Sequence, residues 1–464
     1  MQNINIKFFE KRNKFRNYLH FDKKRSDQKV FEYVVDRDKV SEHSFFPMIS
    51  YKLNDEKICR KNKKRIQIVT LEGKIKKKKT KITNLDFKEK ERLINFPSHM
   101  DGNIYAYYSH LLSLKYEDFL NHNNLSNNVI AFRKVAYTRD SLKKISMCNI
   151  YFAKQVFDYI QKKKNCSVLC FDISSFFDNL NHELLKKMWL EVLNESRLPK
   201  DHYQVFKSLT NFAYVNKEDL YKQLNLSLNS RTLHKRIDRL CDIYTFRNVV
   251  RKNHLIKRNL KVKGIPQGSP MSGMLSNIYM MNFDKNVKNK ITEINGEYFR
   301  YCDDMIFIVD NEYIDEIKKF VLKEIDALKL KINEKKTQYI DFENGIVKKN
   351  SIPSFNYPHK LQYLGLLYDG QEIFLRENGL SKFHYKLRKA IRMRTAHYNR
   401  LQRTNLHNNH NMYMRTLYTR FTYIGKRNYV SYAYRVADEF DSKNIKRQIK
   451  GHFNVFTNYL EKWK

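Results

Sequence analysis

The chain has 464 residues, and its 89 lysines and arginines against 49 aspartates and glutamates give a formal net charge of +40. This length suffices for several domains or subdomains, and so basic a surface favours a polyanionic partner such as nucleic acid. The six cysteines follow no disulfide or zinc pattern, and no apolar run approaches the roughly 18 residues of a membrane span. We therefore expect a cytoplasmic protein without membrane contact.

Residues 1–95 are basic and contain the lysine run KIKKKKTK at Lys74–Lys81. Such a run is either a solvated loop or an arm that contacts RNA phosphates, and the sequence leaves both interpretations open. Beyond it, helical spacing of apolar residues predicts helices over Phe96–Leu120 and Ile150–Ile160. A short strand is expected between them at Val129–Lys134.

The run Ser167–Phe171 reads as a buried strand that ends at Asp172. The alternation of strand side chains places Val168, Cys170 and Asp172 on one face. A carboxylate in such a place is costly to desolvate unless a cation binds it. The alternative is an exposed aspartate that caps the following turn. After it, Asn181 is the expected N-cap of a helix over His182–Leu193.

Residues 195 to about 262 are mostly helical and basic, and the decapeptide GIPQGSPMSG at Gly264–Gly273 follows them. Three glycines and two prolines predict a rigid loop whose backbone can approach a ligand closely. An ordinary tight connection is the alternative. A helix is expected to start in this loop, over Met271–Phe283.

The stretch EYFRYCDDMIFIVD at Glu297–Asp310 predicts two strands joined at Asp303 and Asp304. An isolated Asp-Asp turn is most simply a solvated hairpin tip. A metal-binding tip would need a third carboxylate from elsewhere in the chain. Downstream we expect a helix at Tyr313–Leu328, strands at Lys335–Phe342 and Leu361–Leu367, and basic helices from about residue 376.

Taken in order, these segments resemble the palm of reverse transcriptases. Asp172 with Phe176 and Phe177 resembles the first catalytic motif of that family, and the tetrapeptide YCDD resembles the third. The remaining matches are Pro266-Gln267-Gly268 for the second motif, Asn333 with Lys336-Thr337 for the fourth, and Tyr363-Leu364-Gly365 for the primer grip.

The resemblance implies an α+β right-hand polymerase with fingers, an antiparallel palm sheet that carries the YCDD hairpin, and a helical thumb. The implied boundaries are an N-terminal extension at 1–95, fingers at 96–165, a palm at 166–345 with a helical insertion at about 195–262, a primer grip at 346–375 and a thumb at 376–464.

The same resemblance implies RNA-directed DNA synthesis with two Mg²⁺ ions bound by Asp172, Asp303 and Asp304, and a catalytic Lys336. Oxygen ligands of this kind suit Mg²⁺. Arg133 is expected at the triphosphate, with a salt bridge inside the fingers as the alternative. Phe177 is expected under the deoxyribose, with Phe176 in the core. The other expected contacts are Lys134, Gln267 and Gly268 for the nucleotide, Tyr363, Leu364 and Gly365 for the primer, and Arg388, Arg392 and Arg394 for nucleic acid.

Within the family, FDISSFFDNLNH and GIPQGSPMSG are similar to bacterial group II intron, retron and defence-associated enzymes. The chain lacks the NAxxH and VTG motifs of typical retron enzymes, and about 90 residues after the primer grip are too few for a thumb, a maturase domain and an endonuclease together. This implies a stand-alone enzyme of bacterial antiviral defence. Its expected partners are dNTPs, a DNA primer and an RNA template, with a dedicated non-coding RNA and an oligomer or partner protein left open. An untemplated or protein-primed DNA polymerase and a catalytically silent, maturase-like RNA-binding protein are the alternatives.

Overall fold

The computed structural model describes residues 8–9, 18–60, 85–138, 144–228, 230, 232–348, 359–403 and 414–462. The lysine run at Lys74–Lys81 lies outside these residues. Among the described helices, none combines the length and the apolar character needed to cross a membrane.

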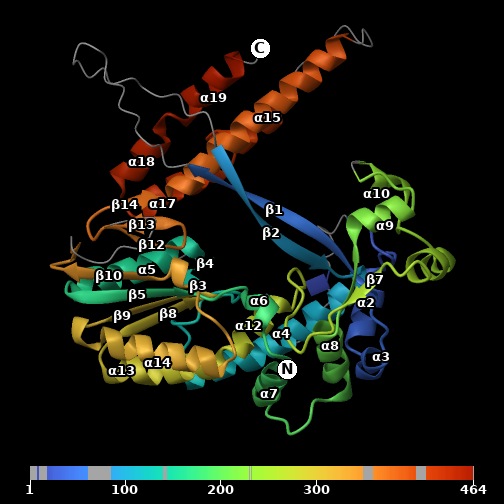
Figure 1. Ribbon diagram of the computed structural model, residues 1–464, viewed down its shortest axis with the longest axis horizontal. Coiled ribbons are helices and arrows are strands. Elements are labelled where there is room, and N and C mark those ends of the chain that lie inside the picture. The colour runs from blue at the N-terminus through green and yellow to red at the C-terminus, as the bar shows by residue number, and fades with distance from the viewer. Residues whose placement is uncertain are drawn as a thin grey trace, which may run out of the picture.

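A five-stranded antiparallel sheet forms the centre of the palm (Figure 1). Along β5, alternate residues enter two different cores: Leu169 and Phe171 pack in one, and Val168 and Cys170 in the other. The predicted strand parity is thereby confirmed. The strand order is β11 (Ile346–Val347), β10 (Gln338–Glu343), β5 (Cys166–Asp172), β9 (Asp304–Val309) and β8 (Glu297–Tyr301).

Helices cover both faces of this sheet. On one face lie α13 (Met281–Glu293) and α14 (Ile314–Ala327), and on the other lies α5 (Asn149–Lys163) (Figure 1). The apolar stripe of α14 is buried as its spacing predicts. The helix expected over Met271–Phe283 is interrupted at Met280, so that α12 (Ser272–Tyr279) ends there and α13 begins.

The fingers contain a second sheet, in the order β2 (Leu85–Phe96), β1 (Met48–Arg60), β6 (Ala213–Asn216) and β7 (Ile256–Arg258). In the long β1–β2 hairpin, Ile49 pairs with Phe96 at the base and Arg60 with Leu85 at the far end. The hairpin rises from the fingers toward the thumb helix α15 (Glu377–Arg403), which β1 contacts (Figure 1). Segments expected as an N-terminal extension and as a palm insertion therefore build one sheet, and the predicted boundaries divide it.

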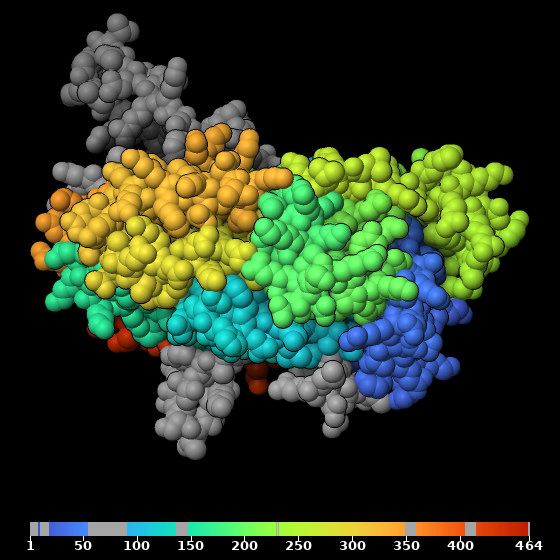
Figure 2. All heavy atoms as spheres, turned by 90° about the horizontal axis from the view of Figure 1, so that it is seen from below, coloured from blue at the N-terminus to red at the C-terminus, as the bar shows by residue number. Residues whose placement is uncertain are grey.

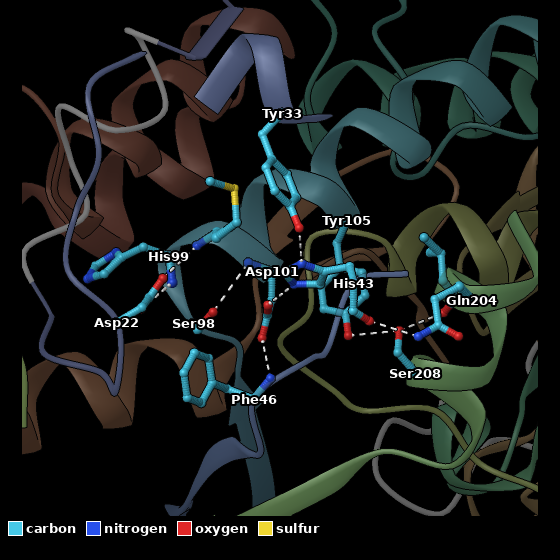
Figure 3. A network of polar contacts seen from close by, with 12 residues as sticks. Asp22, Tyr33, His43, Phe46, Ser98, His99, Asp101, Tyr105, Gln204 and Ser208 are labelled. Carbon is cyan, nitrogen blue, oxygen red and sulfur yellow. Dashed lines mark hydrogen bonds and ion pairs between the residues drawn. The ribbon is translucent and has the colours of Figure 1, made fainter. Parts of the chain in front are cut away.

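Buried polar contacts fasten the N-terminal residues to α4 (His99–His122) (Figure 3). The Asp101 carboxylate lies 2.8 Å from His43 Nε2 and accepts the Phe46 amide, while the Tyr33 hydroxyl meets His43 Nδ1 at 2.9 Å. Asp22 accepts the first two amides of α4. Residues 18–47, with α2 (Asp27–Val34) and α3 (Arg37–Ser41), are thus part of the fingers.

The remaining elements complete the fingers and the thumb. Asn181 caps α7 (His182–Leu193) by accepting the Leu184 amide, as predicted. In the view from below, α4 (cyan) lies between the palm helices α13 and α14 (yellow) and the N-terminal helices α2 and α3 (blue). The helix α8 (Lys200–Thr210; green) lies beside α2 and α3 (Figure 2). The other bounds are β3 (Ala136–Thr138), β4 (Lys144–Ser146), α6 (Phe176–Asn179), α7 (His182–Leu193), α8 (Lys200–Thr210), α9 (Lys217–Gln223), α10 (Leu233–Arg236), α11 (Ile243–Thr245), the π-helical turn η1 (Phe246–Arg251), the 3₁₀ turns η2 (Asn311–Tyr313) and η3 (Glu334–Lys336), β12 (Leu361–Tyr363), β13 (Leu366–Tyr368), β14 (Ile373–Leu375), α16 (Arg415–Phe421), α17 (Tyr429–Glu439), α18 (Lys443–Lys450) and α19 (His452–Glu461).

Two expected strands are wrong. The segment Val129–Lys134 makes only one bridge, from Val129 to Arg300 on β8, and then turns. Leu361–Leu367 is a hairpin, in which Leu364 and Gly365 both have positive φ (45° and 89°) between β12 and β13. A two-residue hairpin turn of this kind requires left-handed backbone at both positions.

Candidate active site in the palm

Three carboxylates meet at one end of the palm sheet. Asp172, the last residue of β5, is the register partner of Asp304, the first residue of β9. The backbone amide of Ile173 donates to the Asp303 carbonyl at 3.3 Å, and Cys302 takes a left-handed φ of 61° that closes the β8–β9 turn. The sheet therefore supplies Asp172 as the third carboxylate that the hairpin tip by itself lacked.

Lys336 neutralises one of these carboxylates. Its Nζ lies 2.6 Å from both carboxylate oxygens of Asp172. The turn η3 that carries the lysine is attached to the same strand, because the Asn333 amide donates to the Asp172 carbonyl at 2.7 Å. Asp172 is thus held from both its side chain and its backbone.

The other two carboxylates have raised pKa values. Burial and repulsion from Asp172 raise the pKa of Asp303. Loss of hydration, with repulsion from Asp303 and Asp172, raises the pKa of Asp304 to about 7. Asp304 nevertheless stands at the exposed surface of the turn, so we attribute more of its shift to the neighbouring charges than to burial. Lys336 and Arg376 oppose this repulsion without cancelling it.

These residues fit divalent cations. Within the described part of the chain, no three His, Cys, Asp or Glu side chains are already arranged as a complete metal site, and Asp172 is engaged by Lys336. The donors are all carboxylate oxygens, which hard cations such as Mg²⁺ prefer. Their mutual repulsion is what a bound cation relieves.

The first two motif segments are hydrogen-bonded to each other. The amides of Ile265 and Gly264 donate to the carbonyls of Phe177 and Leu180 at 2.9 and 2.8 Å. Phe176 and Phe177 lie on the short helix α6, not on an extended strand. Phe176 is 3% exposed in the core, whereas Phe177 is half-buried.

Gly268 sits where the backbone of the loop Gly264–Gly273 meets the fingers. Its φ is +117°, and a Cβ there would lie 2.7 Å from the Asn95 carbonyl oxygen. The preceding Gln267 carbonyl accepts the Asn95 amide at 2.8 Å. Only glycine both adopts this positive φ without strain and lacks the Cβ that would collide with Asn95. The second motif is thereby joined to the base of the β1–β2 hairpin, which the sequence did not indicate.

Arg133 is occupied by internal partners. Its guanidinium binds both oxygens of Glu117, at 2.8 and 2.5 Å, and donates to the carbonyls of Ser126 and Val129. Its side chain is only 5% exposed. These contacts favour the salt-bridge interpretation over a contact with the triphosphate. The neighbouring Lys134 is exposed.

The turn expected as the primer grip lies close to the carboxylates. Tyr363 is 4% exposed, and burial, with an added effect of the Asp304 charge, raises the pKa of its hydroxyl. The Leu364 carbonyl accepts from Asn149 at 3.3 Å, and the Gly365 carbonyl accepts the Arg376 amide at 3.2 Å.

On the thumb helix α15, Arg388 and Arg392 are exposed and Arg394 is half-buried. The Arg388 guanidinium lies 5.5 Å from the centre of the Tyr459 ring. Helix α15, which carries these arginines, extends away from the palm sheet (Figure 1).

A buried ion pair that the sequence did not indicate lies behind the turn between β8 and β9. Arg300 on β8 and Asp284 on α13 are both 0% exposed, with contacts of 2.7 and 2.5 Å. Arg300 also donates to the Cys302 carbonyl and to Asn277 of α12, both at 3.2 Å. The signal was an arginine within the apolar strand run EYFRY, because a charge inside a buried strand requires a partner.

The family model described as reverse transcriptase (RNA-dependent DNA polymerase) matches residues 75–368, more than half of the chain. No curated protein matches the chain. Apo telomerase from Candida tropicalis, truncated from the C-terminal domain, is similar at 16% identity and a TM-score of 0.39, with 67% of this chain and 56% of that chain covered.

Telomerase from Candida albicans in complex with a TWJ fragment of telomeric RNA is similar at 12% identity and a TM-score of 0.38, covering 81% of this chain and 60% of that one. The chain thus spans less than two thirds of the length of these proteins. On the strength of the family match and the palm described above, the chain belongs to the reverse transcriptase family and has the right-hand polymerase fold.

Proposed function

We propose that this protein is an RNA-directed DNA polymerase that adds dNTPs to a primer 3′ end with two Mg²⁺ ions. The observation that carries the proposal is the register pairing of Asp172 with Asp304, which brings both together with Asp303 at one sheet end. Their uncompensated negative charge, expressed in the raised pKa of Asp304, is what a cation-dependent centre requires.

Asp172, Asp303 and Asp304 would hold the two ions. When bound, Mg²⁺ activates the primer 3′-oxygen and stabilises the charge on the leaving pyrophosphate. Lys336 is 45% exposed at its side chain, so its ammonium can leave Asp172 and donate a hydrogen bond or a proton to phosphate oxygens. Phe177 would limit the space at the sugar, and the Gln267–Gly268 backbone would face the nucleotide.

Incorporation of labelled dNTPs by the purified full chain on a defined RNA template and primer tests the proposal. Asp303→Asn preserves the shape of the side chain and removes its charge, so incorporation should fall at least ~10³-fold. Asp310→Asn is the matched control, because this carboxylate sits just beyond the other end of β9, paired with Lys163. Full activity of Asp303→Asn would refute the assignment.

Sequencing the product separates the alternatives. A product complementary to the supplied RNA supports templated synthesis, whereas the same product without RNA would identify an untemplated or protein-primed polymerase. RNA binding with no metal-dependent incorporation would leave the silent, maturase-like function. Bacterial origin and a role in antiviral defence with a non-coding RNA remain predictions from the sequence resemblance. Cytoplasmic location remains a prediction from the cysteine pattern and the absence of a long apolar run.

A further inference from the structure

Phe132 is a large apolar residue in an unfavourable position. Its side chain is 54% exposed, and its backbone adopts a φ of +59°. A bulky non-glycine residue rarely takes left-handed backbone, and doing so costs free energy that the surrounding structure must offset. Packing in the core therefore does not explain why a phenylalanine occupies this position, and a function at the surface is the alternative.

The residues on either side of Phe132 hold it in this conformation. On the C-terminal side, Arg133 is tied to Glu117 by two hydrogen bonds. On the N-terminal side, Asn277 of α12 donates to the Ala131 carbonyl at 2.8 Å, and the Ile130 amide donates to the Arg300 carbonyl at 3.1 Å. Asn277 and Arg300 also bond to each other. The contacts of Arg133 thus make it a positioning residue for Phe132.

This attachment places Phe132 beside the catalytic elements. Arg300 lies on β8 three residues before Asp303, and α12 directly follows the loop that contains Gln267 and Gly268. The Phe132 ring lies against Gly273 of α12, where a Cβ would come within 2.7 Å of two ring atoms. The glycine leaves the space that the ring occupies.

We propose that Phe132 is a stacking platform for a nucleobase at the polymerase site, an inference that rests on the proposed function. A rigid, half-exposed aromatic ring next to the exposed Lys134 offers a flat apolar face and a nearby cation to a base and its phosphate. The base belongs either to the single-stranded template or to the incoming dNTP. Stacking on such a ring contributes roughly 5- to 150-fold in affinity per base.

The experiment compares the full-length wild type, Phe132→Ala and Phe132→Trp in two measurements. Equilibrium binding of a fluorescent single-stranded RNA needs no catalysis, and steady-state incorporation gives the KM for dNTP. A platform for the template predicts that Phe132→Ala loses at least 5-fold in RNA affinity with little change in KM. A platform for the nucleotide predicts the reverse. In either case Phe132→Trp should restore the lost quantity.

Gly273→Ala is a second variant that tests the role of the Phe132 ring. Its added methyl group displaces the Phe132 ring without removing it, so it should reduce the same quantity. In a Phe132→Ala background the methyl group should have almost no further effect. Tyr244→Ala, which removes another ring that is 75% exposed, is the control for the loss of any surface aromatic.

The proposal is overturned if Phe132→Ala keeps wild-type RNA affinity and KM, whatever its thermal stability. It is also overturned if Phe132→Trp fails to restore the lost quantity or if the two substitutions act additively. A wild-type protein that incorporates no dNTP would refute the proposed function instead, and the RNA-binding arm would still report on Phe132.

Discussion

The palm interior and the thumb helix α15 carry their charges in opposite ways. In the palm, Arg300 and Asp284 are fully buried and bind each other. On α15, Arg388, Arg392 and Arg394 form no ion pair with any described residue, and the helix presents them largely to solvent. The buried charges of Arg300 and Asp284 thus balance each other, whereas the three arginines leave α15 with positive charge that no described acidic group offsets.

This difference indicates where the molecule needs partners. Inside the palm, removing one charge leaves its partner desolvated and unpaired, so the expected result is unfolding. On the thumb, removing a charge leaves water in its place, so the expected result is weaker attraction for a polyanion. Folding and binding should therefore respond to mutations in different regions.

Asp284→Asn should produce a large loss of stability, because it leaves the Arg300 guanidinium buried without a counter-charge. We expect the free energy of unfolding to fall by about 3–5 kcal/mol in urea titrations. The partly exposed pair Lys163–Asp310 offers the contrast, because the Asp310 side chain is 45% exposed and Asp310→Asn should cost at most about 1 kcal/mol. Equal losses for the two variants would contradict the distinction between buried and exposed charges.

The same contrast between interior and surface distinguishes two neighbouring residues of the short helix α6, because Phe176 is buried and Phe177 is half-buried. Phe176→Ala should cost about 3–5 kcal/mol, because its ring is buried in the core. Phe177→Ala should cost less and should admit ribonucleotides, measured as the ratio of kcat/KM for NTP and dNTP. If Phe176→Ala relaxes sugar selection and Phe177→Ala unfolds the protein, the two roles are exchanged.

His20 provides a test of a buried group that must stay neutral. Complete burial lowers the pKa of His20 to about 3, while the unfolded chain takes up a proton near pH 6.5. The unfolded state then binds more protons between these values, so stability falls as the pH drops below 6.5, by about 2 kcal/mol at pH 5.

The pH dependence of chemical unfolding measures this effect. His20→Asn is the matched variant, because its amide oxygen can replace the ring Nδ1 that accepts the Phe21 amide at 2.9 Å. We expect the variant to lose less stability than the wild type between pH 6.5 and 5. Parallel curves would show that His20 titrates normally in the folded protein.

The thumb arginines should have the smallest effect on folding. Replacing all three by Ala should change stability by only about 0.5 kcal/mol per site but should reduce the slope of log K against log salt by up to about 2–3 for RNA binding. A control triple substitution removes three exposed cations from the outer palm helix α14, at Lys318, Lys319 and Lys323. An unchanged slope in the thumb variant would show that these arginines do not contact the backbone of the RNA.

The sequence by itself determined the elements whose signals are local. The apolar spacing of α14, the cap at Asn181 and the alternation along β5 each depend on residues a few positions apart, so their periodicity predicted them. The order of the motifs likewise indicated the family. The short turn at Leu364 and Gly365 was not predicted, because the residues on both sides of it are apolar and the whole segment has the composition of a single strand.

Only the tertiary structure decided which distant groups meet. Lys336 contacts Asp172, Arg133 contacts Glu117, and the Gly268 backbone meets Asn95. It also decided that the β1–β2 hairpin and β6 share a sheet. A lysine or arginine has the same local spacing whether it binds a phosphate or a carboxylate. Its role follows from the partner that the fold brings within hydrogen-bond distance, because these interactions depend on separation in space rather than along the chain.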